Sequence, residues 1–241
     1  TLAQQFQRPF RRTDDPHTVV NATRSQAALG DLEAPARPGD DGVQRQAHVG
    51  EADFAVTERH LVLLLPPFVY DIERAKAGET FLDSHVWRPS LGMRVLLLPK
   101  DELNAPRWLQ LPAGFVFHLG NAWEDAQGII RLDYVRSPDA TLVLQGARDL
   151  MRGAVNGNAP VARVARVRLH QASGHVRQEE LPLDTEFPRI DPRRTGRRYR
   201  HVYLAERVDA PLGRPLFDSV TRLDVDTGRV QRHRCGAGVL A

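Results

Sequence analysis

Residues 114–125 read Gly114-Phe115-Val116-Phe117-His118-Leu119-Gly120-Asn121-Ala122-Trp123-Glu124-Asp125, and this stretch decides the fold. A polar stretch, Asn121–Gly128, separates the apolar run Phe115–Leu119 from a second apolar run at Ile129–Val135. The pattern predicts two short strands joined by a polar loop. His118 places an imidazole in the first run, where an unsatisfied buried polar group costs about 1–3 kcal/mol. From the residues alone two interpretations stay open: a core histidine bonded to a backbone carbonyl, or a metal-binding or catalytic histidine.

Short strand-like runs that alternate with turn signals continue on both sides of this stretch. Two clear hairpins are predicted, each with a glycine in its turn: Val161–His170 with Gly174–Leu181, and Ser219–Val225 with Arg229–Arg234. Further strands are expected at Phe54–Thr57, His60–Leu65, Arg94–Leu98, Trp108–Leu111 and Tyr199–Glu206. The helix candidate is Leu142–Met151. The pattern predicts a mainly antiparallel all-β protein of four-stranded units, either a propeller or stacked sheets.

The composition is that of a globular protein. The 241 residues are 41% hydrophobic and 26% charged, which excludes whole-chain disorder, a collagen-like fibre and a coiled coil. The longest apolar run, Leu61–Leu65, is far shorter than a membrane-spanning helix. The net charge is only +3, although almost all of the 33 basic residues are arginines. This arginine bias is typical of a GC-rich genome, so no nucleic-acid partner is expected, and nucleic-acid binding is a distant alternative.

Cys235 is the single cysteine, so no internal disulfide can form, and a reducing, cytoplasmic location is expected. The common nucleotide-binding, zinc-protease and serine-hydrolase motifs are absent from the sequence. Residues 1–52 are rich in Gln, Ala, Arg, Asp, Gly and Pro, and we expect them to be poorly ordered or non-homologous. The strand pattern begins at Asp53, so residues 53–241 are expected to form the folded part.

The stretch 117–125 resembles the iron-histidine motif of the carotenoid cleavage oxygenases, the relatives of apocarotenoid oxygenases, lignostilbene dioxygenases and the retinal pigment epithelium isomerase. Three further segments resemble motifs of this family and occur in the family's order: Asp53-Phe54-Ala55-Val56-Thr57-Glu58-Arg59-His60, Trp87-Arg88-Pro89 with Gly92-Met93-Arg94, and Glu186-Phe187-Pro188-Arg189-Ile190-Asp191. One such motif would be weak, whereas four in order are specific. The resemblance covers residues 53–241.

The resemblance implies a seven-bladed β-propeller with Fe(II) on its axis, held by four histidines that glutamates orient from behind. At about 45 residues per blade, residues 53–241 suffice for an incomplete propeller of about four blades. The implied reaction is dioxygenase cleavage, with O2, of one carbon–carbon double bond in a carotenoid, apocarotenoid or stilbene, giving two carbonyl products. Because family members collect lipophilic substrates, peripheral contact with a membrane is left open.

Five residues receive roles by this resemblance. His118 matches an iron ligand, and Glu186 matches a glutamate that accepts a hydrogen bond from the far nitrogen of a ligand imidazole. Phe115, Phe117 and Phe187 are candidates for the lining of the substrate tunnel, with plain core packing as the alternative. The residues indicate no particular substrate, cleavage position or oligomeric state.

The chain also departs from the family pattern. Ala52 stands where the family has a histidine before Asp-Phe, and the upstream Ala-His-Pro-type motif is not found in residues 1–52. The last ligand of the family would lie beyond Ala241. We therefore expect an internal fragment of a carotenoid oxygenase that lacks tight iron binding and activity. The alternative is a non-catalytic propeller remnant that acts as a lipid-binding or interaction module.

Overall fold

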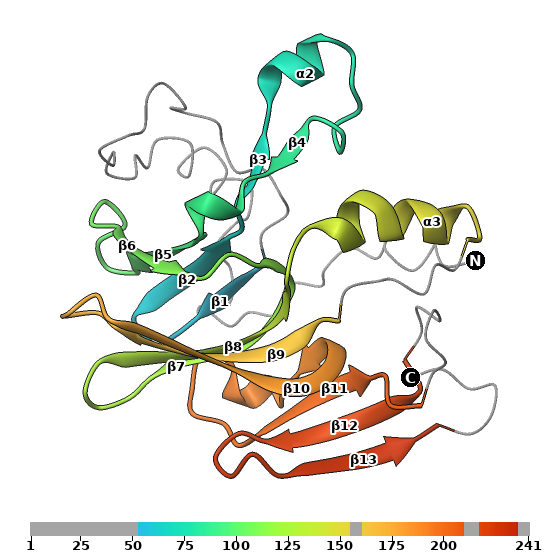
Figure 1. The fold of residues 1–241 in the computed structure, drawn as a ribbon. Helices are drawn as coiled ribbons and strands as arrows, with labels where there is room; N and C mark the ends of the chain where they lie inside the picture. The colour runs from blue at the N-terminus through green and yellow to red at the C-terminus, as the bar shows by residue number, and fades with distance from the viewer. Residues whose placement is uncertain (1–52, 155–160, 210–216, 236–241) are drawn as a thin grey trace, which may run out of the picture. The chain divides into compact units, whose positions relative to one another are not determined.

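The computed structural model describes residues 53–154, 161–209 and 217–235 (Figure 1). The described residues form antiparallel strands with a few short helices, so the expected all-β class is confirmed. The expectation that residues 1–52 are poorly ordered or non-homologous falls on residues outside this description. None of the helices in the described ranges is long and apolar enough to cross a membrane.

The first sheet is four-stranded. Its strands, in sheet order, are β1 (Phe54–Val56), β2 (His60–Leu65), β5 (Met93–Pro99) and β6 (Arg107–Leu111). The two central strands, β2 and β5, are almost wholly buried, which explains why both are continuous apolar runs rather than alternating ones. Pro66 and Pro67 end β2, because proline offers no N–H to the ladder.

Between β2 and β5 the chain makes an excursion that the sequence did not predict. The strands β3 (Phe68–Tyr70) and β4 (His85–Trp87) pair with each other, and α2 (Ile72–Lys76) lies in the connection between them. The side chain of Asp71 caps this helix by accepting hydrogen bonds from two backbone N–H groups of its first turn. A 3-10 turn, Pro89–Leu91, then leads back into the first sheet.

The rest of the chain forms one continuous antiparallel series of seven strands: β7 (Phe115–Glu124), β8 (Ile129–Ser137), β9 (Arg163–His170), β10 (Val176–Arg189), β11 (His201–Glu206), β12 (Ser219–Asp224) and β13 (Val230–Arg234). The strand β10 is 14 residues long and belongs to two four-stranded units. Its first half pairs with β9, and its second half, from Thr185, pairs with β11. Both register shifts of β10, at 180–184 and 186–189, lie at or beside this change of partner.

The described residues thus build three successive four-stranded units, β1-β2-β5-β6, β7-β8-β9-β10 and β10-β11-β12-β13. Dividing the length of residues 53–241 by about 45 residues per blade predicted about four units. The described residues form three because the β3–β4 excursion and the helical segment after β8 add residues without adding strands to these units. The first strand of the second unit, β7, contacts the first strands of its neighbours, β1 and the second half of β10. Side chains from distant parts of the sequence therefore meet along β7.

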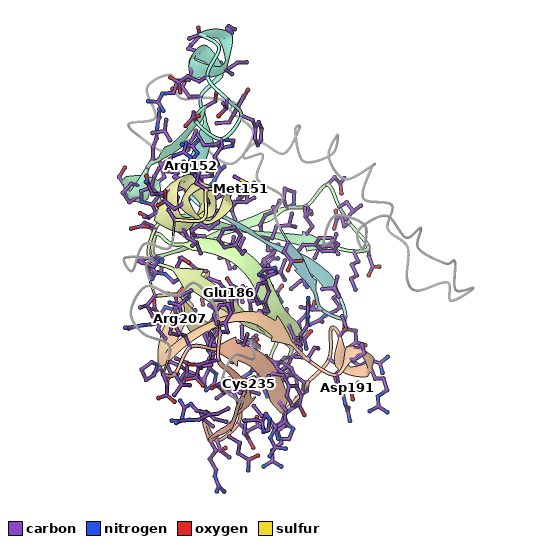
Figure 2. The ribbon with its side chains drawn as sticks, turned by 90° about the vertical axis from the view of Figure 1, so that its right-hand side faces the viewer. Met151, Arg152, Glu186, Asp191, Arg207 and Cys235 are labelled. Carbon is purple, nitrogen blue, oxygen red and sulfur yellow. The ribbon has the colours of Figure 1, made fainter. Side chains whose placement is uncertain are left out.

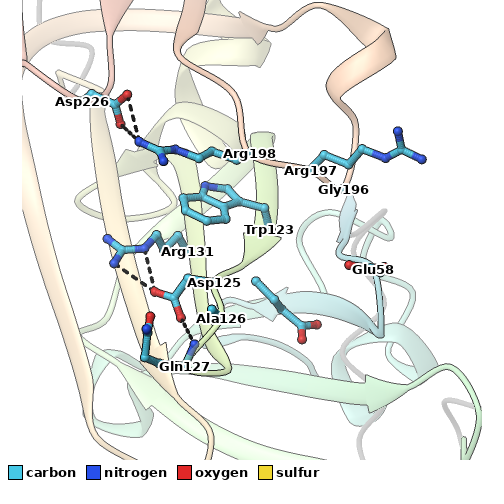
Figure 3. A pocket seen from close by; sticks show the side chains of 11 residues that line it. Glu58, Trp123, Asp125, Ala126, Gln127, Arg131, Gly196, Arg197, Arg198 and Asp226 are labelled. Carbon is cyan, nitrogen blue, oxygen red and sulfur yellow. Dashed lines mark hydrogen bonds and ion pairs between the residues drawn. The ribbon is translucent and has the colours of Figure 1, made fainter.

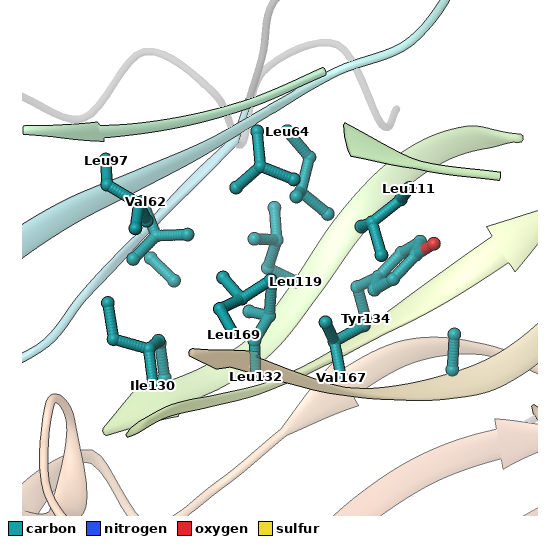
Figure 4. Packing of buried hydrophobic residues seen from close by; sticks show 14 of the residues in the cluster. Val62, Leu64, Leu97, Leu111, Leu119, Ile130, Leu132, Tyr134, Val167 and Leu169 are labelled. Carbon is teal, nitrogen blue, oxygen red and sulfur yellow. The ribbon is translucent and has the colours of Figure 1, made fainter. Parts of the chain in front are cut away.

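Two apolar clusters join these units. The larger one lies between the first sheet and the strands β7–β9, and Figure 4 shows Val62, Leu64 and Leu97 facing Ile130, Leu132 and Leu169. The second lies between β8–β9 and the last unit and includes Val135, Val164, Val202, Leu204 and Leu223. The strand β8 contributes to both clusters, so it is buried on both faces.

Most predicted elements are present, and two strands, β7 and β10, run further than predicted. Both glycine-turn hairpins are confirmed, and the helix candidate Leu142–Met151 forms a π-helical turn followed by α3 (Ala147–Met151). The prediction that the polar stretch Asn121–Gly128 is a loop was wrong in its first half, since β7 continues to Glu124. The polar side chains of this extension bond to other parts of the chain, as described below, which lets a strand hold residues of low strand propensity.

Candidate functional site

The candidate site is a histidine and a glutamate from two neighbouring strands. His118 on β7 and Glu186 on β10 lie 68 residues apart in the sequence, and His118 Nδ1 is 2.9 Å from Glu186 Oε2. The glutamate is buried, whereas about a third of the His118 side chain is exposed. The hydrogen bond from the imidazole to the carboxylate raises the pKa of His118 above its ordinary value, although partial burial acts in the opposite direction.

The Glu186 carboxylate is held from one side. Its Oε2 also accepts a hydrogen bond from the backbone N–H of Phe187, at 2.8 Å. Its Oε1 is buried and has no hydrogen-bond partner among the described residues. A carboxylate that accepts from Nδ1 fixes the imidazole tautomer that leaves the lone pair on Nε2, which is the form that can bind a metal.

Aromatic rings surround this pair. The ring of Phe187 lies 5.1 Å from the His118 ring, and that of Phe117 lies 6.4 Å from it. Phe115 is buried and contacts the rings of Phe117 and Phe68, so it forms part of a packed cluster. Phe187 is 47% exposed. The structure places all three predicted phenylalanines near His118 or one ring away from it, and their role in a substrate tunnel stays a prediction.

The described residues do not supply a complete metal site. No group of three or more His, Cys, Asp or Glu side chains in the described ranges is placed to hold an ion. The donor set at this position is one imidazole backed by one carboxylate, which fits one ligand of a histidine-bound iron and not the whole set. Ala52 lies outside the described residues. An iron centre would therefore need ligands from elsewhere.

Two further histidines of the described residues, His60 and His85, are buried. His60 Nδ1 lies 2.7 Å from Glu124 Oε1, and His85 Nδ1 lies 2.8 Å from the carbonyl oxygen of Phe81. Each imidazole has a local acceptor, so its burial needs no metal.

Glu124, at the end of β7, is a functional residue of the fold that the sequence reasoning missed. Its carboxylate accepts hydrogen bonds from Thr57, Arg59 and His60 of the β1–β2 turn. Burial raises the pKa of Glu124, but these three donors outweigh that effect and hold it below its ordinary value. Glu124 lies in the motif segment 117–125, and its three partners lie in the motif segment 53–60. That both segments carry the family resemblance was the signal in the sequence that could have indicated this contact.

The side chain of Asn121 makes a second connection from β7. Its Nδ2 donates to the carbonyl oxygens of Arg194 and Arg197, and its Oδ1 accepts from the backbone N–H of Gly196. The arginine-rich turn is thereby fixed to the second unit. Asp191 lies at the rim of the molecule in Figure 2, where it bonds to the exposed Arg193.

A surface cavity of about 510 Å³ lies at the Glu124 end of β7 (Figure 3). Charged side chains line most of it, and Arg131 and Arg198 lie over the Trp123 ring at 5.4 and 5.8 Å from its centre. Neither His118 nor Glu186 lines this cavity. Because its lining is mostly charged and does not include the histidine–glutamate pair, it is not the candidate site for an apolar substrate.

The described residues form consecutive four-stranded antiparallel sheets, as in a propeller-type protein. Where the first strands of these sheets contact each other, His118 is hydrogen-bonded to a carboxylate, and it is the single histidine of the candidate site. The family model of the retinal pigment epithelial membrane protein matches residues 47–241. The chain therefore belongs to this family, that of the carotenoid cleavage oxygenases, and the resemblance inferred from the four motifs is confirmed.

Named relatives agree with this assignment. The chain is 29% identical to carotenoid cleavage oxygenase 1 of Neurospora crassa over 76% of its length and 38% of the relative. It is 28% identical to resveratrol cleavage oxygenase 1 of Aspergillus fumigatus, covering 74% of the chain and 39% of the relative. It is 29% identical to isoeugenol monooxygenase of Pseudomonas putida, covering 68% and 33%. The chain thus spans well under half the length of these relatives.

Solved structures carry the same fold. Cobalt-substituted apocarotenoid oxygenase from Synechocystis superposes with a TM-score of 0.64 at 21% identity, over 76% of this chain and 37% of that one. An ACO/RPE65 chimera superposes with a TM-score of 0.64 at 21% identity, over 76% of this chain and 37% of that one. The β-propeller fold expected from the motifs is therefore confirmed, and the chain contains a part of it.

Proposed function

We propose that this chain is part of an Fe(II)-dependent dioxygenase that uses O2 to cleave one carbon–carbon double bond of a carotenoid, apocarotenoid or stilbene into two carbonyl products. Membership of the carotenoid oxygenase family supports the reaction class. The relatives are named for carotenoids, resveratrol and isoeugenol, so a conjugated apolar substrate is the common feature. The single observation that carries the proposal is the hydrogen bond between His118 Nδ1 and Glu186 Oε2.

In this proposal His118 is a metal ligand through Nε2, and Glu186 keeps the proton on Nδ1. A glutamate in this position raises the basicity of the ligand and holds its ring in one orientation. Phe115, Phe117 and Phe187 would keep water away from the imidazole and offer apolar surface to a polyene or stilbene. The described residues contribute one ligand, so the remaining ligands belong to other parts of the whole protein.

We further propose that the chain by itself has no cleavage activity. Ala52 has no lone pair with which to bind a metal, and the described residues supply no group of three ligands. The same observations favour the second candidate function, a non-catalytic propeller remnant that binds a lipid or a partner protein. A cytoplasmic location, peripheral contact with a membrane and the absence of a nucleic-acid partner stay predictions.

The test is the iron content of the purified chain, measured by mass spectrometry after reconstitution with Fe(II), together with product analysis using an apocarotenal and resveratrol. We expect less than one iron per chain and no carbonyl products. The Ala52→His variant should bind more iron than the parent, and the His118→Ala change should abolish that gain. His175→Ala, which removes an exposed histidine, is the matched control and should leave the iron content unchanged.

The outcomes separate the two candidates. Stoichiometric iron and cleavage products from the parent chain, both lost in His118→Ala, would overturn the inactive-chain proposal and support the oxygenase. Iron that His118→Ala retains would contradict the role of His118. Apocarotenoid binding without iron or products, in the parent and in Ala52→His alike, would favour the non-catalytic module.

A further inference from the structure

Phe187 has an unusual backbone conformation. Among the described residues it is the one non-glycine residue with a positive φ, at 55°. This left-handed region is unfavourable for a side chain with a Cβ atom, and the following Pro188 restricts the backbone of Phe187 further. Such a conformation persists only where the surrounding contacts enforce it, and it is concentrated at functional sites.

The conformation belongs to a β-bulge. The register of β10 against β11 shifts between Glu186 and Arg189, so Phe187 and Pro188 together lie opposite one residue, Leu204. At this kind of bulge the left-handed position is usually a glycine, and the extra residue is left out of the ladder. The bulge therefore frees the N–H of Phe187 from strand pairing.

The freed N–H is used to hold the Glu186 carboxylate. Glu186 Oε2 accepts from Phe187 N at 2.8 Å and from His118 Nδ1 at 2.9 Å, while Oε1 has no partner among the described residues. Apart from the imidazole itself, the Phe187 N–H is thus the donor that the described residues provide to orient this carboxylate. An N–H that bonds to an ionised acceptor makes a strong, directional contact.

The ring of Phe187 acts on the same pair from the other direction. It lies 5.1 Å from the His118 ring and 5.8 Å from the Phe217 ring. A glycine at this position would satisfy the backbone with less strain but would leave this side of the imidazole without the aromatic contact. Phenylalanine is therefore unfavourable for the backbone of the bulge, but its ring packs against the His118 imidazole.

We propose that Phe187 is a positioning residue for the His118–Glu186 pair. Its bulged backbone orients the glutamate, which keeps the proton of His118 on Nδ1, and its ring covers the imidazole and slows the exchange of that proton. The inference rests on the proposed function only where it explains why this tautomer matters: with the proton on Nδ1, Nε2 is the nitrogen that can bind a metal.

The test is nitrogen-15 NMR of the His118 ring in the whole chain at alkaline pH, where the imidazole is neutral, with His118→Ala identifying the signals. The parent should show the Nδ1–H tautomer with a slowly exchanging ring proton. Phe187→Gly keeps the bulge and removes the ring, so the tautomer should persist while its proton exchanges at least roughly fivefold faster. Phe187→Ile is β-branched and opposes a positive φ, so the tautomer should shift toward the mixture of a free imidazole.

Phe81→Leu, at an exposed phenylalanine with no ring contact to His118, is the control and should change neither readout. A parent-like tautomer and exchange rate in both Phe187→Gly and Phe187→Ile would overturn the inference. If Phe187→Ile does not fold, Phe187→Gly decides: loss of the tautomer, or an unchanged exchange rate, overturns it. Because this measurement needs neither iron nor substrate, iron that His118→Ala retains, together with these NMR effects, would refute the metal-binding role of His118 in the proposed function and leave the inference standing.

Discussion

At the scale of single residues, Gly120 lies against the buried side chain of Asp133 and leaves no room for a Cβ atom. A Cβ atom added at Gly120 would clash with Asp133 Oδ2. Asp133 is buried on β8 between the second and third units, so its carboxylate has little room to move away. The glycine between His118 and Asn121 is therefore required by packing rather than by a turn.

Gly120→Ala should destabilise the protein by about 1–3 kcal/mol, because an overpacked interior must shift its neighbours. The measurement is the midpoint of urea unfolding. Gly114→Ala, one residue before β7, is the matched control, since its added Cβ would meet the side chain of Arg136, which has more rotatable bonds than that of Asp133, and should cost less. Equal losses in the two variants would show that Asp133 is not the obstacle.

Burial of Asp133 gives a second prediction at this scale. Burial raises its pKa to about 7, although Arg166 and the backbone N–H of Asn121 act to lower it. A carboxyl whose folded-state pKa exceeds its unfolded value binds protons more tightly when folded. Its contribution to the free energy of unfolding is therefore fully present below about pH 4 and is lost as the pH rises to about 7.

Asp133→Asn removes this titration. The variant should be more stable than the parent at pH 8 and close to it at pH 4, because only the parent must bury a charge at high pH. Thermal unfolding across this pH range measures the difference, and each kcal/mol corresponds to roughly 2–4 °C for a domain of this size. A parallel pH dependence in variant and parent would contradict the assignment.

At the scale of elements, Glu124 joins the β1–β2 turn to the end of β7. The three donors that it binds come from one turn, so the contact fixes the first sheet against the second unit at this end. The pKa of Glu124 is lowered in the folded protein. Its contribution to stability is thus present above the unfolded pKa of about 4.5 and is lost as the pH falls through the lower folded value.

Glu124→Gln should lower the free energy of unfolding by about 2–3 kcal/mol near neutral pH, less than for a fully buried pair because Arg59 is largely exposed. The variant should also lose the part of the acid destabilisation that Glu124 causes. Asp125→Asn is the control, since Asp125 bonds within its own turn and to Arg131 of the next strand. A larger loss for Asp125→Asn would contradict the importance of the inter-sheet contact.

The same elements explain how much could be predicted from the sequence. The two long hairpins were predictable because period-two patterns and turn glycines are local signals. The polar end of β7 was not, because Asn121 and Glu124 are stabilised by residues far away in the sequence. The family resemblance indicated His118 and Glu186 separately, and the structure showed that they pair with each other, since no local pattern connects residues 68 apart. The left-handed Phe187 gave no signal, because glycine and not phenylalanine marks that conformation.

At the scale of the whole molecule, stability is distributed unevenly over the strands. The strand β8 lies between the two apolar clusters, whereas β13 is an edge strand with mostly exposed side chains. Hydrogen-exchange mass spectrometry should therefore find the slowest amides in β8 and the fastest of the strand amides in β13, because exchange through local opening follows buried contacts. Comparable protection of both strands would show that an additional contact covers β13.

The strand β10 has a consequence for how the molecule comes apart. One 14-residue strand belongs to two sheets, because its first half pairs with β9 and its second half pairs with β11. Loss of pairing in one of these sheets therefore weakens the pairing of the same strand in the other. Cleavage of the backbone within β10 would disrupt both sheets, whereas cleavage at the turn Asp226-Thr227-Gly228 would detach only the edge strand β13. The two sheets should accordingly melt in one step and resist separation as independent modules.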